Sequence, residues 1–375
     1  MLESLRIQGF RKYSDFELKG FNKINFFLGD NNIGKTSILE AIFTWACGQN
    51  IGPMMNIPLS RGRYSAFQTK YWIMEELLSM FHEKHNLPLT MSFEGVLDGK
   101  VERFNHTVYP SDLLTDYDPS YKNSLDKIIS RTNEVVSAEQ QNMFNLQMFS
   151  TTVVGQWEVK HVGKKTEKIN ITSPISAITN IKPIINAKYV DILSHTAIAE
   201  GSQIYGSLKR EGLMDEVVKK INKIFPEIEG FDLLPYPDGS QPPVSVIRKD
   251  GSIIPMYSCG DGVQRWFYII GALTIYKNAI LCIDEIDLGL HPSAQVEFCR
   301  NVSEYAIRNN VQLFITTHNI EFVDKFLEAI HSEEAIALGV NVFTLRENDD
   351  QAVSIRKLNA LEAYEVRESF NMELR

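Results

Sequence analysis

Residues 24–46 read INFFLGDNNIGKTSILEAIFTWA and join two kinds of local structure through a short turn. The run INFFL is apolar except for one Asn and is predicted to form a short strand. The segment TSILEAIFTWA has apolar residues at helical spacing, namely Ile38, Leu39, Ile42, Phe43 and Ala46. Residues 29–37 are therefore predicted to form a glycine-containing turn that leads from a strand into a helix.

This turn carries the P-loop pattern GxxxxGK[ST]. Its glycines let backbone N–H groups point at phosphate oxygens, and the helix N-terminus that follows favours an anion. We expect Lys35 to reach the β- and γ-phosphates and the Thr36 hydroxyl to coordinate Mg²⁺. The predicted nucleotide-contacting residues of the loop are Gly29, Asp30, Asn31, Asn32, Ile33, Gly34, Lys35, Thr36 and Ser37.

The last third of the chain alternates strand and helix patterns, and this order predicts a parallel sheet covered by helices. The expected strands are AILCID, VQLFIT and VNVFTL, and the expected helices are 261–277, SAQVEFCRNVSEYAIR and NIEFVDKFLEAI. Upstream, Asp98-Gly99 and Asp250-Gly251 predict the turns of two β-hairpins. Residues 207–224 predict a single amphipathic helix, and 189–194 a buried strand.

Two acids follow the predicted strand AILCI, at the edge where a parallel sheet places ligand-binding groups. Asp284 is expected to hold Mg²⁺ beside the P-loop, as carboxylates at such strand ends do. Glu285 is placed to polarise the water that attacks the γ-phosphate. Strands often end in acids, so this interpretation depends on the P-loop that accompanies it.

Two further segments have the residue types of a γ-phosphate contact. In YSCGDGVQR, Ser258 is predicted to cap the following helix, and Gly260 leaves backbone N–H groups open to an anion. His318 follows the strand FITT and is expected to orient the γ-phosphate and the attacking water. A helix start and a structural histidine are the alternative interpretations of the two segments.

Four other residues are candidates for further roles. Asp287 is a candidate for a subunit interface, and His291 for a structural histidine before a helix that begins with Pro292. Arg11 and Lys12, near the P-loop in sequence, either contact nucleotide phosphates or form a solvated turn.

Composition narrows the class of protein. The 375 residues are 44% hydrophobic and 23% charged, as in folded globular proteins, with a net charge of −9 that disfavours a uniformly basic nucleic-acid coat. The four cysteines form no CxxC pair, which fits the reducing cytoplasm. No signal peptide and no apolar run long enough to span a bilayer are evident, so no membrane partner is expected.

Together these motifs resemble ABC-type ATPase heads of the RecF/SMC/OLD class. LRIQGFRKY resembles the N-terminal segment of that class. CIDEIDLGLHP resembles its OLD-type acidic segment, with Ile286-Asp287 replacing Pro-Glu. FITTHN resembles the strand that carries its switch histidine. The resemblance covers about residues 1–50 and 185–375. It implies a P-loop NTPase fold with a mixed or parallel central sheet, an antiparallel β sub-domain and a helical insertion.

The resemblance also implies ATP and Mg²⁺ as cofactors and ATP hydrolysis as the activity. The metal ligands would be Thr36 and Asp284. The catalytic residues would be Lys35, Glu285 and His318. Ser258 and Gly260 would form a signature that acts on the ATP of a second copy. A family glutamine that contacts the nucleotide would be Gln68, Gln147 or Gln156. Three ranges are expected: an N-terminal lobe at 1–110, an inserted region at 111–255 and a C-terminal lobe at 256–375.

Three functions are compatible with these expectations. Heads of this kind without a nuclease domain commonly regulate a separately encoded nuclease or toxin in anti-phage defence, as in PARIS systems, and the segment near 100–180 would then bind the partner. A RecF-like, ATP-dependent DNA-binding repair protein is the alternative. An ABC transporter cassette is disfavoured, because LSGGQ is absent and most of the chain separates Lys35 from Asp284.

Overall fold

The computed structural model describes residues 1–61, 78–83, 88–110, 152–173, 181–240, 242–330, 338–348 and 353–370. The chain divides into two compact units. Unit 1 comprises Met1–Glu3, Gly20–Ala46 and Ile185–Arg375, and unit 2 comprises Ser4–Lys19 and Cys47–Ile184. These units differ from the three ranges expected from sequence, because the P-loop strand pairs with strands from the C-terminal half of the chain.

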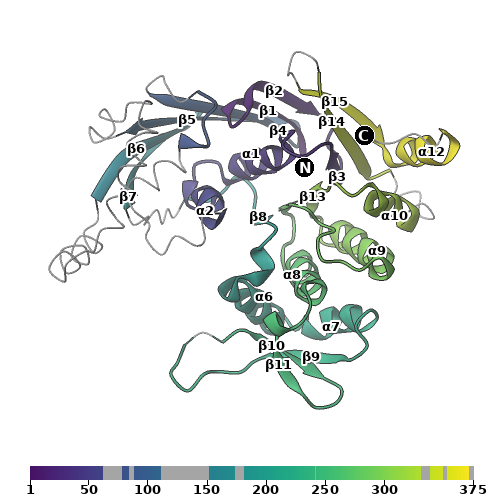
Figure 1. Cartoon of the computed structure of the whole chain (residues 1–375). Helices are drawn as coiled ribbons and strands as arrows, with labels where there is room; N and C mark the ends of the chain where they lie inside the picture. The colour runs from purple at the N-terminus through teal and green to yellow at the C-terminus, as the bar shows by residue number, and fades with distance from the viewer. Residues whose placement is uncertain are drawn as a thin grey trace, which may run out of the picture. The chain divides into compact units, whose positions relative to one another are not determined.

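Unit 1 is built on a six-stranded sheet in the order β15-β14-β3-β13-β12-β8 (Figure 1). The P-loop strand β3 (Ile24–Leu28) lies between β13 (Gln312–Thr316) and β14 (Val340–Glu347), parallel to both. Strands β12 (Ile280–Ile283) and β8 (Ala187–Val190) continue the parallel part, and β15 (Val353–Asn359) is antiparallel to β14. The central sheet is therefore mixed, which is one of the two forms that the resemblance implied, and not wholly parallel as the strand–helix alternation indicated.

The strand ends bring the predicted site residues to one edge of this sheet. Strand β3 leads through 29–34 into α1 (Lys35–Cys47), β12 is followed by Asp284, and β13 ends at Thr316. Because β3, β13 and β12 are consecutive and parallel, their carboxyl ends lie side by side.

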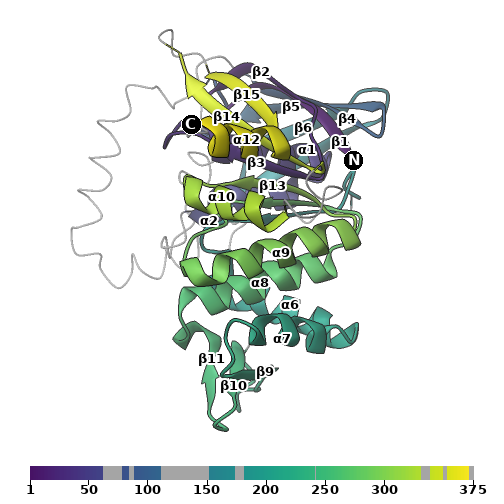
Figure 2. The ribbon, with the colours of Figure 1, turned by 90° about the vertical axis from the view of Figure 1, so that its right-hand side faces the viewer.

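Helices of unit 1 form a continuous row that starts beside the sheet (Figure 2). Helix α10 (Ile320–Ile330) packs on α9 (Pro292–Arg308), and α9 packs on α8 (Asp261–Ile275). Helix α12 (Ala360–Phe370) packs on β14, β15 and α10. The rings of Trp266 on α8 and Phe298 on α9 pack edge to face, with their centroids 5.1 Å apart. Both side chains are fully buried, so this contact holds α8 against α9.

At the far end of this row, two helices cover a small antiparallel sheet, β11-β10-β9. Its strands are β9 (Ile228–Leu233), β10 (Val244–Arg248) and β11 (Ile253–Pro255), and the predicted turn at Asp250-Gly251 joins the last two. The single helix predicted for 207–224 is wrong. The structure has α6 (Ile198–Arg210) and α7 (Met214–Asn222), separated at Gly212, whose φ of +69° is left-handed.

Unit 2 is an antiparallel β unit with the strand order β2-β1-β4-β5-β6-β7. Its elements are β1 (Leu2–Phe10), β2 (Tyr13–Lys19), α2 (Ile51–Arg61), β4 (Leu89–Leu97), β5 (Lys100–Pro110), β6 (Thr152–His161) and β7 (Thr166–Ser173). Leu97 pairs with Lys100 across the turn predicted at Asp98-Gly99, where both residues have positive φ. The expected antiparallel sub-domain is confirmed.

Two other predictions concern segment ends. The strand predicted for 189–194 is too long, because β8 ends at Val190. After it, Asp191 accepts hydrogen bonds from the Leu193 N–H and the Ser194 hydroxyl, and these bonds turn the chain. The helical insertion expected within 111–150 lies outside the described residues. No described helix is long and apolar enough to cross a membrane.

Candidate functional site

The loop between β3 and α1 has the backbone geometry that its glycines predict. Gly29 has a φ of +141° and Gly34 a φ of +111°. A Cβ on Gly29 would lie 2.7 Å from the Leu345 carbonyl oxygen, so a larger residue would displace the loop from β14. Asp30, Asn31 and Asn32 are exposed, whereas the Ile33 side chain is buried beneath the loop.

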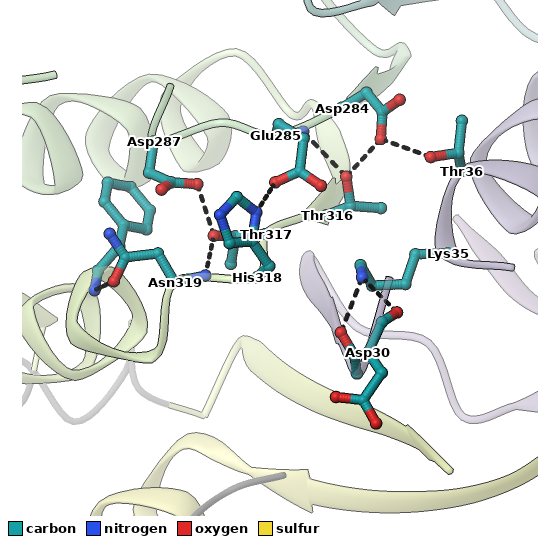
Figure 3. A network of polar contacts seen from close by, with 12 residues as sticks. Asp30, Lys35, Thr36, Asp284, Glu285, Asp287, Thr316, Thr317, His318 and Asn319 are labelled. Atoms are coloured by element: carbon teal, nitrogen blue, oxygen red, sulfur yellow. Dashed lines mark hydrogen bonds and ion pairs between the residues drawn. The ribbon is translucent and has the colours of Figure 1, made fainter. Parts of the chain in front are cut away.

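Lys35 lies inside this loop and is 6% exposed. Its ammonium donates to the carbonyl oxygens of Gly29 at 2.8 Å and Asp30 at 3.0 Å (Figure 3). A cation at the start of α1, beside the helix N-terminus, makes this loop electropositive and suited to phosphate.

Asp284 receives two hydroxyl groups from different elements. The Thr36 hydroxyl, on α1, donates to Asp284 Oδ1 at 3.1 Å, and the Thr316 hydroxyl, at the end of β13, donates to the same oxygen at 2.5 Å. The two residues that the sequence pairs as metal ligands are therefore adjacent. Hydroxyl and carboxylate oxygens are the hard donors that Mg²⁺ takes beside phosphate, so this donor set fits the cation.

Glu285 and His318 form the second pair of the site. The His318 ring nitrogen Nδ1 lies 2.8 Å from Glu285 Oε2, and both side chains reach solvent, with 54% and 23% exposure. Glu285 has a φ of +47°, a conformation in which a side chain with a Cβ is strained. Its backbone N–H donates to the Thr316 hydroxyl at 2.9 Å, so tertiary contacts hold this conformation.

Arg265 donates hydrogen bonds to the backbone of both Asp284 and Glu285. This α8 residue is 1% exposed, and its guanidinium donates to the carbonyl oxygens of Asp284 at 3.2 Å, Glu285 at 2.6 Å and Ile192 at 3.3 Å. Burial lowers the pKa of Arg265, although nearby carboxylates, first of all that of Asp287, act in the opposite direction.

Thr317, the residue after Thr316, makes a similar contact with Asp287. The Thr317 hydroxyl donates to Asp287 Oδ1 at 2.5 Å and accepts the Asn319 N–H at 3.0 Å. Sequence reasoning assigned no role to Thr316, Thr317 or Arg265. The sequence did contain a signal for the two threonines: they end a predicted strand, and two acids follow another predicted strand of the same sheet.

The Ser258 prediction needs a correction. Helix α8 begins at Asp261 with Gly260 as its N-cap, and no side chain caps it. Ser258 instead ends a 3₁₀ turn, Met256–Ser258, and is exposed, as is Gly260. Two residues separate Ser258 from the helix, so its hydroxyl is not the cap that the sequence predicted.

The remaining candidates have mixed outcomes. His291 is the N-cap of α9, and its ring accepts the Ser293 N–H at 3.3 Å, which is a structural role. Arg11 lies in the β1–β2 turn of unit 2 and donates to the Ser79 carbonyl at 3.2 Å. Among the glutamines, Gln156 is in β6, whereas 68 and 147 lie outside the described residues.

Comparisons with known proteins agree with this arrangement. Residues 1–46, which contain the P-loop, match the family model "AAA ATPase domain". Residues 196–324, which contain both acids and His318, match "AAA domain, putative AbiEii toxin, Type IV TA system". The crystal structure of an Smc head bound to the C-winged helix domain of ScpA superposes with a TM-score of 0.52 at 12% identity, covering 97% of this chain and 99% of that one.

The chain has the ABC-type P-loop ATPase fold of an SMC head, and the two family models identify it as an ATPase. A Helicobacter pylori protein named "ATP/GTP phosphatase" is 23% identical to this ATPase over 368 residues, which is 94% of each chain. The RecF protein of Rickettsia canadensis is 22% identical over 371 residues, covering 87% of this ATPase and 96% of RecF. The ATPase is thus similar to RecF along nearly the whole of RecF.

Proposed function

We propose that this ATPase is a molecular switch, the regulatory subunit of an anti-phage system that controls a separately encoded nuclease or toxin. The observation that carries the proposal is the joined network of Thr36, Asp284, Thr316, Glu285 and His318 at one sheet edge. It is suited to ATP hydrolysis, and no group of three or more His, Cys, Asp and Glu in the described ranges suggests a metal-dependent nuclease centre. A chain whose evident chemistry is ATP hydrolysis acts through a change of conformation.

In this proposal each residue has one task at the nucleotide. Lys35 exchanges its carbonyl partners for the β- and γ-phosphate oxygens, and the loop N–H groups hold the remaining charge. Thr36 and Asp284 would hold Mg²⁺, which neutralises charge that develops on the phosphates. Glu285 accepts a proton from the attacking water, and His318, bonded to that carboxylate, orients it toward the γ-phosphate.

The regulatory role is tested by asking which macromolecule follows the nucleotide state. Tagged Glu285→Gln protein, purified from its native host with ATP and Mg²⁺, should retain a nuclease or toxin and release it when ATP is replaced by ADP. Lys35→Ala protein, unable to hold ATP, is the matched control and should retain none. Absence of any such protein from the Glu285→Gln preparation would contradict the regulatory role while leaving ATP hydrolysis untouched.

A RecF-like DNA-binding function is the second candidate, and the similarity to RecF over 96% of that protein favours it. The net charge of −9 opposes extensive phosphate contact. Binding of a fluorescent duplex with a single-stranded gap, measured with and without ATP at two salt concentrations, separates the candidates. ATP-dependent binding that weakens with salt would support the RecF-like function.

A further inference from the structure

We propose that Thr316 is a positioning residue that holds both acids of the ATPase site and thereby sets the Mg²⁺ affinity of the nucleotide-loaded protein. The inference rests on ATP hydrolysis alone. It is independent of whether a toxin, a nuclease or DNA is the partner.

The position of Thr316 in the sheet makes the contact possible. It is the last residue of β13, whose neighbour Ile315 is in register with Ile283 on β12. The next residue of β12's chain is Asp284, so the two side chains meet at adjacent strand ends. Thr316 is fully buried, and packing therefore fixes the direction in which its hydroxyl points.

One hydroxyl group makes two different bonds. It donates its proton to Asp284 Oδ1 at 2.5 Å and accepts the Glu285 N–H at 2.9 Å. The first bond fixes the side chain of the metal-side acid, and the second fixes the backbone of the catalytic acid. A hydroxyl can do both because it is donor and acceptor at once.

The Glu285 bond matters because the backbone there is left-handed, with a φ of +47°. Such a residue stays in place only where surrounding groups hold it. Arg265 holds the carbonyl of Glu285, His318 contacts its carboxylate, and Thr316 holds its N–H. Without the Thr316 hydroxyl, the Glu285 N–H loses this partner. The backbone from which the Glu285 carboxylate extends is then held less firmly.

The Asp284 bond matters because Thr36 shares the same acceptor oxygen at 3.1 Å. Thr36 is itself the residue expected to face the cation. Thr316 reaches Asp284 from another element, β13, and is a buried contact that orients the carboxylate independently of Thr36. Groups that orient a ligand in this way typically change metal affinity or activity 10–100-fold when they are removed.

Three variants test the proposal. Thr316→Val keeps the shape and removes the hydroxyl, whereas Thr316→Ser restores it. Thr274→Val is the matched control, because the Thr274 hydroxyl is also buried but donates to the Ile270 carbonyl within α8 at 2.7 Å. The measurements are calorimetric titration of Mg²⁺ into protein saturated with a non-hydrolysable ATP analogue, analogue binding in EDTA, and kcat.

We expect Thr316→Val to weaken Mg²⁺ binding about 10-fold and to lower kcat by roughly 10–100-fold, with analogue affinity in EDTA unchanged. Thr316→Ser and Thr274→Val should behave as wild type in all three measurements. A Thr316→Val protein with wild-type Mg²⁺ affinity would overturn the proposal. Equal losses in Thr316→Val and Thr316→Ser would also overturn it, since they would show that packing rather than the hydroxyl is needed.

These outcomes are separable from the fate of the proposed function. If no effector or DNA ever follows the ATP state, the Mg²⁺ titration still reports on Thr316. If Thr316→Val binds Mg²⁺ as wild type does, the regulatory role is unaffected.

Discussion

Lys35, Thr36, Asp284, Glu285 and His318 each have a polar partner within hydrogen-bond distance. These contacts hold the side chains of the site in place and so reduce the ordering that ligand binding has to supply. It also means that single substitutions separate binding from chemistry, because the P-loop cation and the Glu285–His318 pair contact different atoms.

Lys35→Ala removes the cation inside the loop and should lower ATP affinity at least 100-fold, with hydrolysis lost in consequence. Glu285→Gln keeps the shape of the side chain but not the base, so ATP should bind normally and turn over about 100-fold more slowly. Equilibrium binding of a fluorescent ATP analogue and phosphate release measure the two effects. The control is Lys277→Ala, which removes an exposed cation paired with Glu211. Wild-type hydrolysis by Lys35→Ala would contradict the assignment of the loop.

His106 gives unit 2 a dependence on pH. This fully buried ring accepts the Trp157 Nε1–H at 3.3 Å, and burial lowers the pKa of His106 from 6.5 to about 3. The unfolded chain therefore binds the proton more readily than the folded one. The stability contributed by neutral His106 is complete above pH 6.5 and is lost, by about 1.4 kcal/mol per pH unit, as pH falls toward 3.

His106→Gln retains an acceptor for Trp157 and removes the titration. Denaturant unfolding of the protein, followed by tryptophan fluorescence from pH 7 to pH 4.5, should show a shallower loss of stability in this variant than in wild type. The exposed His82→Gln is the control and should keep the wild-type slope. An unchanged slope in His106→Gln would show that other groups cause the acid sensitivity.

At the scale of elements, the break between α6 and α7 is where local sequence periodicity gave the wrong structure. Leu208, Val217 and Ile221 are all buried, as one amphipathic helix would have them. Gly212 nevertheless ends α6, and the two helices then cover the β9–β11 sheet separately. A glycine C-terminal to a helix is a known stop signal, which the apolar spacing outweighed in the prediction.

Two glycines near this break provide a matched test. A Cβ at Gly206 or at Gly212 would meet nothing within 4 Å, so only backbone conformation differs between them. Gly206 is inside α6, and Gly206→Ala should raise the free energy of unfolding by about 0.5–1 kcal/mol. Gly212→Ala should lower it by about 1–2 kcal/mol because φ is +69°. Thermal unfolding measures both, and a stabilising Gly212→Ala would refute the left-handed assignment.

At the scale of the whole molecule, we expect ATP to drive self-association. Ser258 and Gly260, which the resemblance predicts to act on the ATP of a second copy, are both exposed. A twofold pair with two composite sites is the simplest closed assembly.

Light scattering of Glu285→Gln with ATP and Mg²⁺ should therefore report about twice the monomer mass. Ser258→Arg in the same background should remain monomeric, because a long cation would occupy the place of the second nucleotide. Ser240→Arg, at an exposed loop position, is the matched control and should still associate. A monomeric Glu285→Gln protein would contradict the composite site.

The partner-binding role expected for the segment near 100–180 is tested by deletion of residues 111–150. We expect the shortened chain to hydrolyse ATP and to lose the retained effector. Retention of the effector together with loss of ATP hydrolysis would instead place the segment in the catalytic head.

The sequence by itself determined the P-loop, the strands that flank it and the identity of the two acids, because each depends on a local pattern of glycines, apolar runs and strand ends. The positions of Lys35, Thr36, Asp284, Glu285 and His318 followed from those patterns. Only the tertiary structure decided that Thr316 and Arg265 hold the acids, because those contacts join strand β13 and helix α8 to the end of β12, and no local period encodes them. It likewise decided that Gly260, not Ser258, is the N-cap of α8, because the backbone at Ser258 forms a separate 3₁₀ turn.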